Sequence, residues 1–152
     1  MQLNIDKCKV MRYTRNKCLI EGAYGLNGKQ IERIYQIKDL GVIFDSKLTC
    51  TPHIDYIVNK SLRKLGYLKR HTTTFKDIST IVILYKTLIK PILMYASTVW
   101  SPNYADHMKR IESVQHKFFS YASYKAKIQN PRISHNYYEI SQLTNLCTLE
   151  SN

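Results

Sequence analysis

Apolar and polar residues alternate over most of the first 48 positions of the chain, which is the pattern of short β-strands. Residues 8–14 alternate and are rich in strand-forming side chains, and residues 40–45 form a second short apolar run. These segments predict a small, mostly antiparallel sheet at the start of the chain.

A hairpin is predicted between these two runs. Residues 19–26 and 29–34 are separated by Asn27 and Gly28. Both of those residues tolerate a positive φ, so Asn-Gly between alternating segments favours a two-residue hairpin turn.

The pattern changes to a helical period at Thr51. We predict Thr51 as the N-cap and Pro52 as the first helical residue, since the first turn does not use the N–H that proline lacks. At 100° per residue, one side of this helix carries its apolar residues: Ile54, Ile57, Val58, Leu62, Leu65 and Leu68. The other side carries Lys60, Arg63, Lys64, Tyr67, Arg70 and His71.

No acidic residue interrupts this basic side, although like charges one turn apart repel each other. An ordinary solvated surface is one interpretation. Contact with phosphates explains the missing acids better, because phosphates would neutralise the repelling charges. We therefore predict that four residues of this helix contact a nucleic-acid backbone: Lys60, Arg63, Lys64 and Arg70.

Further helices are expected after this one. A helix from Asp77 is apolar nearly all round, which predicts that it is the buried centre of a bundle. Pro91 should interrupt it, because proline removes a backbone donor and clashes with the preceding turn. A third helix is expected over residues 105–123 and a short fourth over residues 136–143.

Composition adds a strong charge signal. The 152 residues include 23 Lys and Arg against 11 Asp and Glu, a formal net charge of +12. Residues 1–76 carry 15 basic and 6 acidic side chains, net +9, whereas residues 77–152 carry 8 and 5, net +3. This excess favours a polyanionic partner, with nucleic acid as the first candidate.

The four cysteines form no C-x-x-C pair, and Cys50 and His53 lack the second pair that a zinc site needs. We expect no signal peptide and no transmembrane helix, because Lys86, Lys90 and Pro91 break the longest apolar run. These features predict an intracellular protein, nuclear or cytoplasmic, with reduced thiols, no metal site and no membrane partner.

Four stretches, taken in order, resemble the C-terminal part of one enzyme family. They are residues 3–9 (LNIDKCK), 24–45 (ending IKDLGVIFD), 48–70 and 84–118. In this order and spacing they are similar to the end of the palm and to the thumb of reverse transcriptases of non-LTR retrotransposons, of the LINE and jockey-like kind.

The resemblance implies a division into three segments. Residues 1–48 would be the post-catalytic palm segment with a primer-grip-like hairpin, residues 49–125 a helical thumb, and residues 126–152 a truncated C-terminal extension. The fold class is therefore expected to be α+β, with a small antiparallel palm-end hairpin sheet followed by an all-helical thumb-like bundle.

Individual roles follow from the same resemblance. Leu40 and Gly41 match the primer-grip turn, where glycine lets the backbone approach the primer's 3′ end; a simple tight turn is the alternative. Lys7 matches a lysine near the phosphates of the incoming nucleotide; an exposed lysine before a strand is the alternative. The basic helix would follow the backbone of an RNA–DNA or DNA duplex without reading sequence.

Catalytic residues are expected to be missing. Nucleotidyl transfer needs paired carboxylates that hold two metal ions, and these enzymes supply two of them from a Tyr-x-Asp-Asp turn. The chain has no Asp-Asp pair. Tyr104 and Asp106 imitate that turn, but His107 replaces the second Asp and Asp106 should open a helix, where an acid suits the helix dipole.

We therefore expect a fragment of an RNA-directed DNA polymerase that positions primer and template but is inactive alone. The segment itself should hold no cofactor, whereas the full-length enzyme of this family is expected to use Mg²⁺. Its other partner would be the upstream fingers and palm of the same polyprotein. Two alternatives stay open: a stand-alone basic nucleic-acid-binding module, and a translated relic without function.

Overall fold

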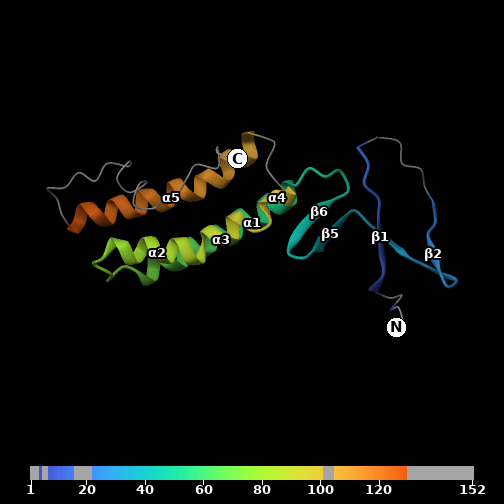
Figure 1. Cartoon of the computed structure of the whole chain (residues 1–152), viewed down its shortest axis with the longest axis horizontal. Coiled ribbons are helices and arrows are strands. Elements are labelled where there is room, and N and C mark those ends of the chain that lie inside the picture. The colour runs from blue at the N-terminus through green and yellow to red at the C-terminus, as the bar shows by residue number, and fades with distance from the viewer. Residues whose placement is uncertain (1–3, 5–6, 16–21, 101–104, 130–152) are drawn as a thin grey trace. The chain divides into compact units, whose positions relative to one another are not determined.

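The structure is a computed structural model that describes residues 4, 7–15, 22–100 and 105–129. It divides into two compact units, residues 1–53 and 54–152. The first unit contains short strand pairs and the second contains helices (Figure 1). The predicted α+β fold class is confirmed.

Two short strand pairs lie in the first unit. β1 (Lys9–Met11) pairs in parallel with β4 (Glu32–Ile34). β2 (Gly25–Leu26) and β3 (Lys29–Gln30) form an antiparallel hairpin. The Asn-Gly turn between them has φ values of 50° and 78°, so the predicted hairpin is confirmed.

The longest pair of the first unit is a second antiparallel hairpin. β5 (Gln36–Asp39) runs back against β6 (Val42–Asp45), with Leu40 and Gly41 as the turn. The hydrophobic pattern predicts β6 but not β5, because Ile37 is the only apolar residue of β5. The pairing of β5 is set by the turn rather than by its own pattern.

Asp45 organises the loop that leads from β6 into α1 (Thr51–His71). Its carboxylate accepts hydrogen bonds from the backbone N–H groups of Lys47, Thr49 and Cys50, at 2.9–3.2 Å. The Thr49 hydroxyl donates a further bond at 3.1 Å. Burial, and then the negative charge of Asp45, raise the pKa of the Cys50 thiol above its ordinary value.

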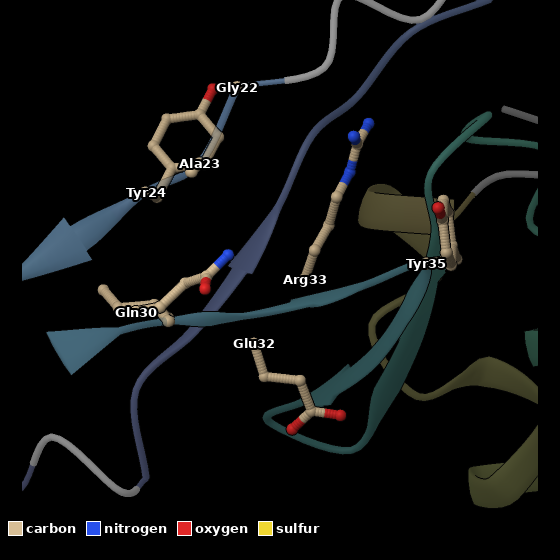
Figure 2. A pocket seen from close by; sticks show the side chains of 8 residues that line it. Gly22, Ala23, Tyr24, Gln30, Glu32, Arg33 and Tyr35 are labelled. Atoms are coloured by element: carbon tan, nitrogen blue, oxygen red, sulfur yellow. The ribbon is translucent and has the colours of Figure 1, made fainter.

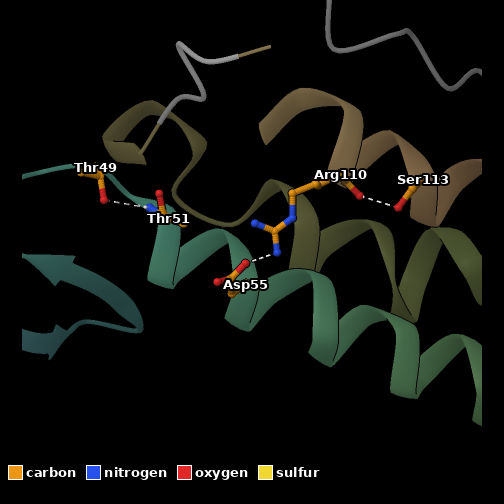
Figure 3. A network of polar contacts seen from close by, with 5 residues as sticks. All are labelled: Thr49, Thr51, Asp55, Arg110 and Ser113. Carbon is orange, nitrogen blue, oxygen red and sulfur yellow. Dashed lines mark hydrogen bonds and ion pairs between the residues drawn. The ribbon is translucent and has the colours of Figure 1, made fainter. Parts of the chain in front are cut away.

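This helix begins one residue earlier than predicted, at Thr51 rather than at Pro52. Thr51 is already helical, and its N–H donates to the Thr49 hydroxyl at 3.4 Å (Figure 3). Leu48 and Cys50 adopt left-handed φ values of 53° and 58°, and the turn that they shape brings Thr49 to the start of the helix. The side-chain oxygen that accepts from the first helical N–H therefore belongs to a residue that periodicity does not single out.

In the second unit, α1 and α5 (Ala105–Gln129) run in the same direction. Near their starts, the Arg110 guanidinium pairs with the Asp55 carboxylate (Figure 3). Just beyond the end of α1, the hydroxyls of Thr72 and Tyr121 are 2.7 Å apart. After α1 the chain runs back in the opposite direction before α5 begins. This connecting part consists of α2 (Ile78–Leu88), α3 (Lys90–Met94) and α4 (Ser97–Trp100) (Figure 1).

Local signals determine both ends of α2. The Asp77 carboxylate accepts bonds from the N–H groups of Ser79 and Thr80, each at 3.1 Å, which makes Asp77 the N-cap. Pro91 lies in the first turn of α3, and α2 ends just before it. The predicted start and the predicted interruption are both confirmed.

The prediction that α2 is buried on all sides is wrong. Ile81, Val82 and Tyr85 are buried, but Ile83 and Leu88 are 58% and 42% exposed. Packing within the described residues covers one side of α2, so the apolar residues on the other side remain in solvent.

α5 extends to Gln129, six residues beyond the predicted end at residue 123. The predicted fourth helix, over residues 136–143, lies outside the described residues. No helix in the described part of the chain is long and apolar enough to cross a membrane.

The core of the second unit includes a stack of two aromatic rings. Tyr85 and Phe118 are fully buried, and their ring centroids are 4.0 Å apart at an interplanar angle of 16°. This contact joins α2 to α5, so much of the unit's packing depends on the two rings.

We expect Phe118→Ala to lower the free energy of unfolding by about 3–5 kcal/mol, because it leaves a large cavity beside Tyr85. Urea unfolding followed by the helical circular dichroism signal measures this loss. The control is Tyr124→Ala on the same helix, whose side chain is 64% exposed; it should change stability by less than about 0.5 kcal/mol. Equal losses in the two variants would contradict the assignment of the core.

Candidate nucleic-acid interface

The buried side of α1 determines which residues the helix exposes. Most of the predicted apolar stripe is buried: Ile54, Ile57, Val58, Leu65 and Leu68. Leu62 is only half-buried. Because a helix has 3.6 residues per turn, burial of this stripe turns the intervening residues toward solvent.

The opposite side of α1 carries four basic residues that together form the basic face: Lys60, Arg63, Lys64 and Arg70. All four side chains are exposed, as the sequence predicts. Among the described residues, no carboxylate lies within 4.0 Å of the charged groups of Arg63, Lys64 or Arg70. The ammonium of Lys60 lies 5.7 Å from the centre of the Tyr56 ring, a cation–π distance.

A shallow hollow of about 430 Å³ lies on the same side of α1. Its lining residues are Asn59, Leu62, Arg63, Gly66 and Arg70. Gly66 leaves room at the centre of the hollow, since a Cβ there would meet nothing closer than Arg70 Nη1 at 3.8 Å. The hollow is not among the sequence-predicted features, although a glycine in the middle of a helix was a usable signal.

Two exposed rings, Tyr67 and His71, lie on the same part of α1 as the hollow but do not line it. Tyr67 follows Gly66 directly, and its ring lies against the His71 imidazole with centroids 4.1 Å apart and an interplanar angle of 40°. Tyr67 is 51% exposed, so this contact leaves a large part of its ring open to solvent.

The turn formed by Leu40 and Gly41 protrudes from the β5–β6 hairpin. Its φ values are 44° and 86°, and Leu40 is 85% exposed. A left-handed conformation costs a residue such as leucine about 1–2 kcal/mol, and exposure of its side chain gains nothing in return. The turn therefore exposes its backbone and the Leu40 side chain to solvent. The pairing of β5 with β6 must hold Leu40 in its left-handed conformation.

His53 fixes this hairpin from the first turn of α1. Its Nδ1 accepts a hydrogen bond from the backbone N–H of Ile43 at 3.2 Å, and the side chain is only 1% exposed. Burial, and secondarily the positive charge of Lys38, lower the pKa of His53 below its ordinary value. The neutral imidazole is therefore the form that the folded hairpin prefers.

The sequence-predicted residues do not form one described site. The basic face lies in the second unit, whereas Lys7 and the Leu40–Gly41 turn lie in the first. Lys7 is exposed just before β1, and its backbone N–H donates to the Asn4 carbonyl at 3.2 Å. No contact described for Lys7 adds to the predicted role.

The first unit has its own hollow, of about 660 Å³, between the β2–β3 hairpin and β4. Arg33 lies between Tyr24 and Tyr35 in this hollow, and its guanidinium is 5.6 Å from the centre of the Tyr35 ring (Figure 2). Glu32, also part of the lining, pairs with Lys9 at 3.3 Å. Because this hollow carries both signs of charge, it suits a polyanion less well than the basic face does.

The motif that imitates a catalytic turn is only partly described. Asp106 lies exposed in the first turn of α5, as predicted, whereas Tyr104 lies outside the described residues. Within the described ranges, no group of three or more His, Cys, Asp or Glu side chains is placed to hold a metal ion.

A scan of the chain against protein-family models found no match, and neither did comparisons with curated proteins and with solved structures. The functional interpretation therefore depends on the residues themselves.

Acid is expected to destabilise the folded protein through His53. The unfolded chain binds a proton on this residue near its ordinary pKa of 6.5, whereas the folded chain does so only at lower pH. The free energy of unfolding should therefore be level above pH 6.5 and fall as the pH drops toward the folded-state pKa. Urea unfolding at a series of pH values between neutrality and mild acid measures the fall.

His53→Asn is the informative variant, since its Oδ1 can accept the Ile43 bond but does not titrate. The fall should be smaller in this variant. If this variant shows the same fall as the wild type, His53 is not the group responsible.

Proposed function

We propose that this chain binds nucleic acid through the basic face of α1. The observation that carries the proposal is the placement of four exposed cations on one side of one helix, none of them in a described ion pair: Lys60, Arg63, Lys64 and Arg70. Phosphates would relieve the repulsion within this face, and the contacts would fix position without reading sequence.

More specifically, we propose that the chain is the post-catalytic palm and thumb part of a non-LTR retrotransposon reverse transcriptase. The four ordered stretches support this assignment, as does the exposed turn of Leu40 and Gly41, where a primer end could approach the backbone closely. In this assignment the catalytic carboxylates and their Mg²⁺ belong to the upstream palm of the same polyprotein.

A stand-alone binding module is the second candidate. Residues 54–152 form a compact unit of their own, and this unit contains the whole basic face. Such a module would need no upstream palm in order to hold nucleic acid.

The charge proposal is tested by the salt dependence of binding. For four phosphate contacts, log K should fall with log salt at a slope of about −3 to −4, and conversion of the basic face to glutamine should flatten this slope. Fluorescence anisotropy of a labelled duplex measures it. The control converts four exposed lysines elsewhere to glutamine, with the same change in net charge: Lys76, Lys109, Lys117 and Lys127. An equal effect of the two variants would show that binding does not depend on α1.

The family proposal is tested at the gene. We expect the reading frame on the 5′ side of Met1 to encode a Tyr-x-Asp-Asp turn, because the resemblance begins after that turn. Sequencing of the locus decides between the two candidates. An unrelated upstream sequence would favour the stand-alone module, or a relic if the binding experiment also fails.

A further inference from the structure

The surface around Gly66 has features that binding to a phosphate backbone alone does not require. Asn59, Arg63, Gly66 and Arg70 recur at helical spacing, so all four border the same hollow on the outer side of α1. Gly66 destabilises a helix relative to alanine. The space around it would accept a Cβ at ordinary contact distance, so packing does not require a glycine there.

The two arginines give this hollow a defined chemistry. Arg63 and Arg70 lie on either side of Gly66, and no described carboxylate is within salt-bridge distance of either guanidinium. A guanidinium presents several N–H donors in a planar fork that matches phosphate oxygens. The amide of Asn59 adds both a donor and an acceptor at the border. The hollow therefore suits one phosphate group.

Tyr67 places an aromatic surface beside that phosphate position. It is one turn after Arg63 and three residues before Arg70, so it adjoins both arginines on the helix surface. Its ring is supported on one side by His71 and is 51% exposed. A ring held in this way loses little conformational freedom when a flat ligand stacks on it.

We propose that the outer side of α1 binds a nucleotide of single-stranded nucleic acid, with its phosphate in the Gly66 hollow and its unpaired base stacked on Tyr67. Bases inside a duplex already stack on their neighbours, so an aromatic side chain gains most from a base that is unpaired. The proposal rests on the proposed function and specifies the form of nucleic acid that this face prefers.

The first test compares Tyr67→Leu with the wild type on a labelled single strand and on a blunt duplex, at one salt concentration. Stacking of one base contributes about 5- to 150-fold in affinity. We expect a loss in this range for the single strand and less than about 2-fold for the duplex. Tyr124→Leu is the matched control, since it removes an exposed tyrosine from α5, 64% exposed against 51% for Tyr67, and should affect neither substrate.

Gly66→Ala distinguishes an effect on nucleic-acid binding from an effect on folding stability. Alanine favours the helix, so the variant should unfold at a higher temperature than the wild type, while its methyl group narrows the hollow and weakens single-strand binding. Weaker binding by a more stable protein cannot be explained by misfolding. Unchanged single-strand affinity in this variant would overturn the phosphate position.

The outcomes also separate this proposal from the one on which it rests. If Tyr67→Leu weakens both substrates equally, or neither, the single-strand proposal fails while backbone binding by the basic face stands. If the wild-type protein binds neither the single strand nor the duplex at low salt, the proposed function fails as well.

Discussion

Burial of one side of α1 is the constraint on which the proposed interface depends. The side chains of Ile54, Leu65 and Leu68 are almost completely removed from water, and each contributes about 1.5–3 kcal/mol to folding. A helix cannot bury this stripe without presenting the residues opposite it. The repulsion among the cations of the basic face is therefore tolerated because the apolar side outweighs it.

The free-energy cost of placing a positive charge on α1 depends on the position of the residue along the helix. Lys69, Arg70 and His71 lie in the last turn, where the negative end of the helix dipole stabilises positive charge. Lys60 and Lys64 lie in the middle of the helix, one turn apart, and receive no such compensation. The central part of the face is thus where an external anion would relieve the most repulsion.

Features fixed by neighbouring residues could be predicted from the sequence, and features that need distant partners could not. The Asn-Gly hairpin, the Asp77 cap and the break at Pro91 each follow from backbone chemistry within a few positions. The parallel pairing of β1 with β4 joins segments more than 20 residues apart, and nothing local encodes it. Exposure of Ile83 also escaped prediction, because periodicity shows which residues are apolar but not how many sides the neighbouring helices cover.

The same distinction applies to the candidate site. Periodicity alone places the basic face correctly, whereas the hollow at Gly66 depends on how the flanking arginine side chains extend from the helix.

The Asp45 loop gives the protein a chemical reporter of its own. A thiol reacts as its thiolate, and burial and then the Asp45 carboxylate raise the pKa of Cys50, which lowers the fraction of thiolate. Opening of the loop would remove both effects at once. The rate at which Cys50 reacts with an alkylating reagent should therefore rise when the segment leading into α1 opens.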